Sequence, residues 1–141
     1  MQRKASAAWQ GGLKDGKGTL ATESKALSGI PYSFGTRFES VPGTNPEELL
    51  GAAHAGCFSM ALSMMLGEAG IKPERIETTA TITFEKLDTG FTITRSHLDV
   101  AVKAPGADRG KFDDAAQKAK AGCPLSKVLK AEISMDARLD A

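Results

Sequence analysis

The stretch of residues 49–67 constrains the possible folds of this chain most, because it contains no Asp, Glu, Lys or Arg. It follows a strong helix start, in which Asn45 can be the N-cap, Pro46 takes the first helical position and Glu48 takes the capping-box position. The pattern predicts a helix that begins at Pro46 and ends near Gly70. A helix that is apolar on all sides must be covered on all sides. In a chain of 141 residues, a second copy can supply that cover, so we expect a homodimer.

The same stretch has to be tested as a membrane span. A spanning helix needs about 20 predominantly apolar residues. This one contains His54, Ser59, Ser63 and three glycines, and its first turn is acidic. Such residues oppose membrane insertion, so we do not expect this helix to span a membrane.

The charge balance and the cysteine content narrow the class of protein. The 18 Lys and Arg residues against 17 Asp and Glu residues give a formal charge of +1, which offers no basic surface for a nucleic acid. Only Cys57 and Cys123 occur, outside any CxxC pair, so there is no secreted-type disulfide framework. The basic first residues lack the apolar run of a signal peptide. We therefore expect a cytoplasmic protein without a nucleic-acid partner.

The length and the hydrophobic pattern predict a single α+β domain over residues 1–141. Short strands between residues 9 and 39 are separated by turn signals and predict an antiparallel meander. The last of them would place Phe34, Thr36 and Phe38 on one face and Arg37 on the other.

In the second half of the chain, apolar and polar residues alternate along the predicted strands. Residues 75–87 predict a half-buried strand, which is joined through a short loop at 88–90 to a second strand. Along that second strand the apolar residues change from odd-numbered to even-numbered positions. This change predicts a bulge between Arg95 and Leu98. Helices are expected at 112–120 and 125–130, followed by a strand at 132–139.

The two cysteines are the candidates for chemistry. Cys57 lies within the uncharged helix, where a thiol is ordinarily a small inert core residue and burial raises its pKa. Cys123 directly precedes Pro124, near the start of a predicted helix whose free amides stabilise a thiolate. Peroxide chemistry needs one activated thiolate and a second thiol within reach. The spacing alone does not establish that reach, so inert thiols and a redox switch remain alternatives.

A reactive Cys57 would need a cation beside it. Arg37 is the candidate, against the alternative of a solvated strand arginine. Glu47 or Glu48 could hold its guanidinium through a carboxylate pair. The alternative for both is helix capping, which is favoured for Glu48.

A metal centre and a bound cofactor are the other possibilities. His54, Cys57, Cys123 and His97 could in principle share a metal ion, but they lack the paired short spacings of structural zinc sites. No phosphate-binding glycine loop, nucleophile elbow or dinucleotide fingerprint occurs. We expect no metal and no cofactor.

Four segments of the chain resemble a known family. Residues 31–39 (PYSFGTRFE), 43–49 (GTNPEEL), 52–62 (AAHAGCFSMAL) and 118–126 (KAKAGCPLS) are similar to the OsmC/Ohr family, and the likeness extends over essentially the whole chain. The two cysteine segments are specific to the family, and the segment at 36–38 looks like its OsmC branch. The resemblance implies a thiol peroxidase that reduces organic hydroperoxides. It also implies an intertwined α+β homodimer with antiparallel sheets and a long central buried helix, and no metal, flavin or haem.

The resemblance also implies roles for four residues. Cys57 matches the peroxidatic cysteine and Cys123 the resolving cysteine. Arg37 matches the arginine that activates the thiolate, and Glu47 the carboxylate that orients it. The expected cycle passes through a Cys57 sulfenic acid and a Cys57–Cys123 disulfide, which an external dithiol reduces. The Ohr branch suggests a lipoyl-type dithiol.

The expected substrates follow from apolar side chains near the candidate site. Phe34, Phe38, Phe58 and the helix methionines would favour alkyl or lipid hydroperoxides over hydrogen peroxide, which gains little from hydrophobic burial. A non-catalytic redox sensor or binding protein that uses the same cysteine pair is the alternative function.

Overall fold

A computed structural model describes residues 1–141, and its internal contacts group the chain into two compact units, Met1–Leu49 and Leu50–Ala141. Each unit has its own three-stranded sheet. Together they form an α+β protein with two small sheets and helices, as the sequence predicts. The prediction of a single domain over the whole chain stays a prediction.

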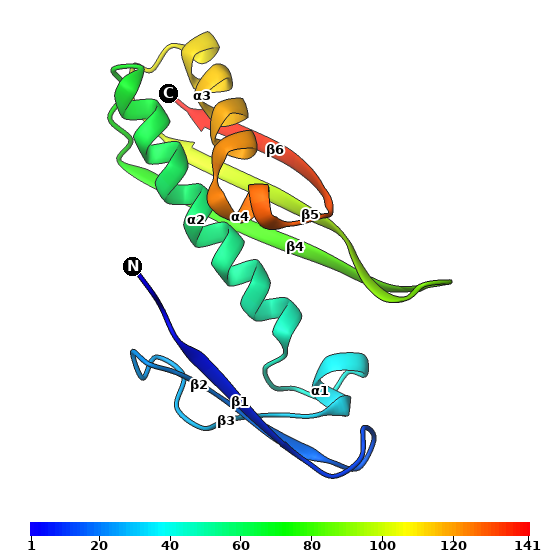
Figure 1. The fold of residues 1–141 in the computed structure, drawn as a ribbon. Helices are drawn as coiled ribbons and strands as arrows, with labels where there is room; N and C mark the ends of the chain where they lie inside the picture. The colour runs from blue at the N-terminus through cyan, green and yellow to red at the C-terminus, as the bar shows by residue number, and fades with distance from the viewer. The chain divides into compact units, whose positions relative to one another are not determined.

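The first unit is built on an antiparallel meander. Strands β1 (Ala5–Gln10), β2 (Lys17–Thr22) and β3 (Ile30–Tyr32) are adjacent in that order (Figure 1). Trp9 pairs with Gly18, and Gly18 pairs with Tyr32 on its other side. The rings of Trp9 and Tyr32 meet across Gly18 with their centroids 5.4 Å apart, in space that a side chain at Gly18 would occupy.

The prediction of a strand at residues 34–38 is wrong, because this segment is the short helix α1 (Phe34–Phe38). Ser33 caps it: the Ser33 hydroxyl accepts from the Thr36 amide, and the Thr36 hydroxyl accepts from the Ser33 amide. This reciprocal capping box satisfies two amides that have no partner at a helix start. Phe34 and Phe38 are then one helical turn apart, and their rings stack with centroids 4.9 Å apart.

The helix predicted to begin at Pro46 is present as α2 (Pro46–Glu68), and its place as a central buried helix stays a prediction. Its start is the predicted one, since the Asn45 side-chain oxygen accepts from the Glu48 amide at 2.8 Å. By length and composition, α2 is the one helix of the structure that could cross a membrane, a criterion that core helices of soluble proteins also meet.

The second unit places helices over one face of a mixed sheet. Strands β4 (Arg75–Leu87) and β5 (Gly90–Lys103) form an antiparallel hairpin, and β6 (Glu132–Asp140) lies parallel to β5. The expectation of antiparallel sheets is therefore wrong for this sheet, because two helices cross over between β5 and β6 and return the chain in the same direction. The connection from β5 to β6 runs through α3 (Arg109–Gly122) and α4 (Pro124–Val128), and α2 and α3 lie over the same face of the sheet (Figure 1).

The hairpin contains its irregularity just before the segment in which the sequence predicts it. Thr83 pairs with Arg95 and Phe84 pairs with Ile93, so Thr94 is the extra residue. The predicted bulge between Arg95 and Leu98 is therefore wrong in position. The inserted residue still explains the change of apolar phase along β5, because each extra residue reverses the face of those that follow.

The core of the second unit lies between its helices and the inner face of the sheet. Helix α2 supplies one buried residue per turn in this region, because residues four apart share a face. Helix α3 and strand β5 complete the core. Its fully or almost fully buried members are Phe58, Leu62, Leu66, Leu98, Val100, Val102, Ala104, Phe112, Ala115, Ala116, Ala119 and Cys123.

Candidate active site: a thiol pair and an arginine-carboxylate pair

The second unit brings the two cysteines together. Both are free, and their sulfur atoms lie 3.2 Å apart, although the residues are 66 positions apart in the chain. Cys57 comes from the middle of α2, and Cys123 is the N-cap of α4. Cys123 is fully buried, whereas Cys57 is half-buried. The reach that the sequence spacing could not establish is present in the structure.

The surroundings of the two sulfurs push their pKa values apart. Burial raises the pKa of Cys57, the backbone amide of Leu125 opposes that shift, and the contact with Cys123 adds to it. Burial also acts to raise the pKa of Cys123, but the polar groups around its sulfur, the Ser126 amide foremost, bring it below its ordinary value. Burial thus opposes the ionisation of Cys57, and a cation beside its sulfur would favour the thiolate.

The first unit holds the predicted arginine-carboxylate pair. The Arg37 Nε and Nη2 groups both donate to Glu47 Oε1, at 3.0 and 2.9 Å. Glu47 is buried, and its other oxygen, Oε2, has no hydrogen-bond partner. The guanidinium also lies over the Phe38 ring, with its carbon 5.1 Å from the ring centroid. Two donors on one oxygen and an aromatic face fix the orientation of Arg37.

The choice between Glu47 and Glu48 as the partner of Arg37 is made by helix geometry. Successive residues of a helix point about 100° apart, so the two carboxylates cannot face the same guanidinium. Glu47 turns to Arg37, whereas Glu48 is exposed and its amide receives the Asn45 cap.

Beside Arg37 the first unit contains a mainly apolar pocket of about 230 Å³. Aromatic rings make most of its wall. The lining residues are Trp9, Leu13, Tyr32, Ser33, Phe34, Arg37 and Phe38. Phe34 and Phe38 line this pocket, whereas Phe58 is fully buried in the core of the second unit. A role of these rings as a substrate wall stays a prediction.

The structure does not assemble the metal site considered from the sequence. Both ring nitrogens of His54 are hydrogen-bonded to serine hydroxyls, Ser96 at 2.7 Å and Ser126 at 2.8 Å. His97 alternates with the buried residues of β5 and so lies on the other face of the sheet. The ring nitrogens and the two sulfurs therefore do not converge on a common point.

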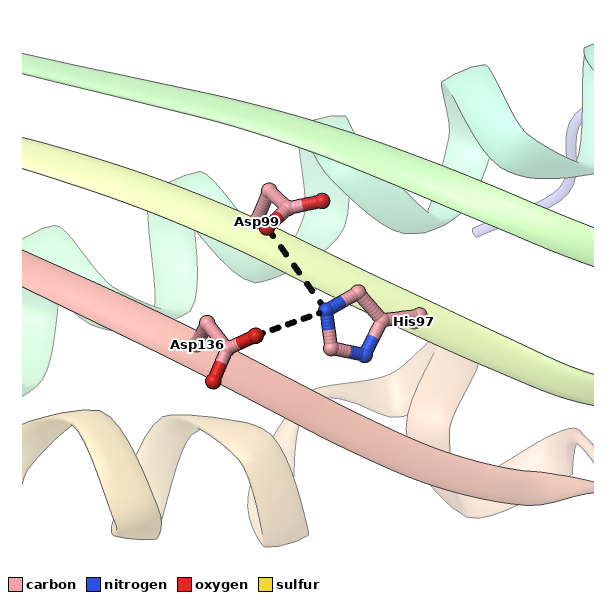
Figure 2. A group of neighbouring side chains, drawn as sticks. All are labelled: His97, Asp99 and Asp136. Carbon is pink, nitrogen blue, oxygen red and sulfur yellow. Dashed lines mark ion pairs between the residues drawn. The ribbon is translucent and has the colours of Figure 1, made fainter.

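His97 belongs to a separate group on the outer face of the second sheet. Its Nε2 atom lies 3.6 Å from Asp99 Oδ1 and 3.3 Å from Asp136 Oδ2. Figure 2 shows both aspartates turned toward the same ring nitrogen. Its Nδ1 atom is hydrogen-bonded to Ser134 at 2.6 Å. The three groups could each offer one ligand atom to a cation. Their partial exposure and mutual ion pairing explain the cluster without one.

The serine partners of His54 were not found by sequence reasoning. Ser96 is buried on β5 and Ser126 lies on α4, and both were hidden among ordinary hydroxyl residues. The available signal was positional: His54 precedes Cys57 by three residues and Ser126 follows Cys123 by three, so on helices each pair shares a face.

The fold and the two sulfurs in contact define an α+β protein with a dithiol centre. The chain belongs to the OsmC family, because the family model described as OsmC-like protein matches residues 38–138. The peroxiredoxin OsmC of Escherichia coli K12 is 58% identical over 139 residues, which cover 99% of this chain and 97% of that protein. The organic hydroperoxide resistance protein OhrB of Bacillus subtilis is 30% identical over 102 residues, covering 72% and 73%.

Solved structures show the same fold. The crystal structure of OhrB from Bacillus subtilis aligns with a TM-score of 0.67 at 23% identity and covers 97% of this chain and 98% of that one. An OsmC-like protein of unknown function from Vibrio cholerae aligns with a TM-score of 0.77 at 17% identity, covering 98% and 99%.

Proposed function

We propose that this protein is a cysteine-based peroxidase that reduces organic hydroperoxides to alcohols. The observation that carries the proposal is the 3.2 Å separation of the Cys57 and Cys123 sulfurs in the reduced protein. Two thiols at this distance can form a disulfide after a small movement, since the bond itself is about 2.05 Å long. The names of the relatives, a peroxiredoxin and organic hydroperoxide resistance proteins, support a peroxidase-type function.

In the first step the Cys57 thiolate attacks the terminal oxygen of the hydroperoxide. A sulfur–oxygen bond forms and the oxygen–oxygen bond breaks. The alkoxide leaves and takes up a proton as the alcohol, and Cys57 becomes a sulfenic acid. Sulfur is oxidised by two electrons, and the peroxide is reduced by the same two.

In the second step Cys123 attacks the sulfenic sulfur. The disulfide bond forms, the sulfur–oxygen bond breaks, and hydroxide leaves and is protonated to water. An external dithiol then reduces the disulfide through a mixed disulfide and returns both thiols. A lipoyl-type dithiol in the cytoplasm fits this step, because its two thiols close into their own disulfide.

Arg37 and Glu47 are proposed to serve the first step. Burial raises the pKa of Cys57, so the thiolate needs a positive charge. The Arg37 guanidinium is the proposed source, and Glu47 holds its orientation through two hydrogen bonds to one carboxylate oxygen. Glu47 is thus a positioning residue for Arg37.

The apolar pocket beside Arg37 supports an organic substrate. Burial of apolar surface contributes about 25 cal/mol per Å² to the free energy of binding. An alkyl or lipid hydroperoxide has such surface, whereas hydrogen peroxide has none. The rings of Phe34 and Phe38 are the groups proposed to contact the organic part.

The exposed side of α2 supports a homodimer. Between residues 52 and 67 this side carries no charge, and Met60 and Met64 are 78% and 55% exposed. An apolar helix face of this kind requires cover, and a second copy presents the same face, as a two-fold interface requires. The exposed residues of this stretch, here called the α2 face, are Ala52, Ala53, Gly56, Met60, Ser63, Met64 and Gly67.

Peroxide consumption with a dithiol in excess tests the function. The protein should turn over many equivalents of an organic hydroperoxide, Cys57→Ser should turn over none, and Cys123→Ser should complete one reduction without an efficient cycle. Formation of the disulfide without continued consumption would contradict the peroxidase and favour the redox sensor.

A further inference from the structure

Trp9 and Leu13 line the apolar pocket beside Arg37, but the proposed cycle gives neither of them a role. Trp9 lies near the end of β1, and Leu13 lies on the turn that joins β1 to β2. This turn is at the same end of the first sheet as α1 (Figure 1), which supplies Phe34, Arg37 and Phe38. The pocket therefore has one wall from α1 and another from the end of β1 and its turn.

The side chain of Trp9 is held in one orientation. Its indole Nε1–H donates to the Gly11 carbonyl oxygen at 3.1 Å, and its ring packs against that of Tyr32 at an angle of 58°. Gly16 and Gly18 leave room for the ring, because a Cβ atom at Gly16 would lie 2.9 Å from Trp9 Cζ2 and one at Gly18 would come closer still to the ring. A side chain locked by packing and a hydrogen bond is a fixed boundary.

The volume of the pocket limits how much hydrocarbon it can bury. An apolar cavity of about 150 Å³ holds one benzene molecule. By the same ratio the pocket of about 230 Å³ holds roughly nine carbon atoms. Leu13 is 62% exposed at the rim of the pocket, so carbons beyond that number stay in water and gain nothing from burial.

We propose that Trp9 is a specificity-determining residue: it forms the pocket wall that α1 does not, so binding strengthens with the size of an organic hydroperoxide up to roughly nine carbons and gains nothing from longer chains. This inference rests on the proposed peroxidase function, because it names the size class of the substrate. Arg37 is the one charged residue of the lining, so the peroxide group lies toward Arg37 and the hydrocarbon toward Trp9.

The first test uses the fluorescence of Trp9, which is the single tryptophan of the chain. The probes are linear alcohols from hexanol to dodecanol, which resemble the products of the reaction and cannot oxidise the thiols. Each added methylene should lower the dissociation constant about four-fold up to roughly nine carbons, after which the constant should level off. An emission that no alcohol changes would overturn the proposal, and so would an affinity that still rises four-fold per methylene up to dodecanol.

Two variants of the first unit locate the binding. Phe38→Ala removes another ring of the pocket and should weaken the binding of each alcohol by about ten-fold. Val41→Ala is the matched control, because Val41 is an apolar residue, 51% exposed, that does not line the pocket. It should leave the dissociation constants unchanged. Equal weakening in both variants would contradict a site in this pocket.

The second test shortens the wall and measures substrate preference. Trp9→Leu should raise kcat/KM for dodecyl hydroperoxide relative to hexyl hydroperoxide by about ten-fold, because the pocket can then bury more methylenes. The change should appear in KM rather than in kcat, since contacts with the organic part hold substrate and transition state alike. A merely structural role of Trp9 would lower kcat for both substrates by the same factor, and that unchanged ratio would overturn the proposal.

A milder variant keeps the second test decisive if Trp9→Leu fails to fold. Trp9→Phe retains an aromatic ring against Tyr32 and should raise the same ratio by a smaller factor. An unchanged ratio in Trp9→Phe would contradict the proposal.

The peroxidase function and the size limit fail in different ways. Alcohol binding involves no cysteine chemistry, so a protein without peroxidase activity would still give the predicted fluorescence titration. Failure of the size limit would leave turnover intact while the affinity does not level off. A Trp9 emission that changes with protein concentration but with no alcohol would show that a second copy covers this wall, and would overturn the proposal.

Discussion

The sulfur atoms of Cys57 and Cys123 lie 3.2 Å apart at the contact between the middle of α2 and the start of α4. The two helices are joined through a β-hairpin and α3, so the contact depends on the whole second unit. Each thiol alters the other: the contact raises the pKa of Cys57 and lowers that of Cys123. Cys57 is therefore the thiol that depends on an added cation.

Removal of the Glu47 charge should impair peroxide reduction because both hydrogen bonds of Arg37 end on this carboxylate and would be left with a neutral acceptor. Glu47→Gln should lower kcat/KM for an organic hydroperoxide by about ten-fold, which corresponds to replacing charge-assisted hydrogen bonds by weaker neutral ones. Steady-state kinetics measure the effect. The control is Glu48→Gln, which changes the same charge on the next residue, and equal losses in both variants would remove Glu47 from its assigned role.

The aromatic wall beside Arg37 should determine substrate preference. Phe38→Ala should reduce kcat/KM for a bulky organic hydroperoxide more than for hydrogen peroxide, because only the organic substrate gains from apolar burial. Comparison of the two substrates in parent and variant measures this. Phe91→Ala, on the exposed hairpin of the second unit, is the control. Equal effects on both substrates would show that the pocket does not select.

A charge on the α2 face should disrupt the proposed dimer. Met60→Glu places a carboxylate in an interface that requires apolar contact, and should convert the dimer to a monomer in light scattering coupled to size-exclusion chromatography. Leu87→Glu changes an exposed apolar residue at the end of β4 and should leave the dimer intact. A native protein that is already monomeric at micromolar concentration would contradict the dimer.

The free energy of unfolding should fall as the pH decreases below the ordinary pKa of histidine. Burial lowers the pKa of His54 from its ordinary 6.5, so the unfolded chain binds the proton more readily than the folded one. The stabilisation is complete above pH 6.5 and is lost as the pH falls toward the lower, folded pKa. Urea denaturation between pH 7.5 and about 5 should show this decline, with a shallower slope in His54→Gln. An identical slope in both proteins would show that His54 does not cause it.

The elements with strong local signals were predictable. Asn45 and Pro46 specify the start of α2, and the alternation of residues 75–87 corresponds to β4 in full. The segment 34–38 was mispredicted, because alternating Phe34, Thr36 and Phe38 fit a strand as well as a helix. The hydroxyls of Ser33 and Thr36 decided for the helix.

The candidate site was predictable in its residue types but not in its geometry. The resemblance of the two cysteine segments to a known family indicated Cys57 and Cys123. Only the fold of the second unit brings their sulfur atoms into contact. Glu47 and Glu48 are the same residue type at adjacent positions. The direction in which each side chain leaves α2 decides that Glu47 contacts Arg37. Ser126 could not be predicted as a partner of His54, because the two residues are 72 positions apart in the chain.

The central claim is that Cys57 and Cys123 form a disulfide within a catalytic cycle. Intact mass and peptide mapping of the reduced protein, before and after one equivalent of an organic hydroperoxide, test it most directly. The account predicts the loss of two hydrogens, mapped to Cys57 joined to Cys123, and continued peroxide consumption when a dithiol is then supplied with excess peroxide. Unchanged mass at both thiols would contradict the account and leave only the fold and the family.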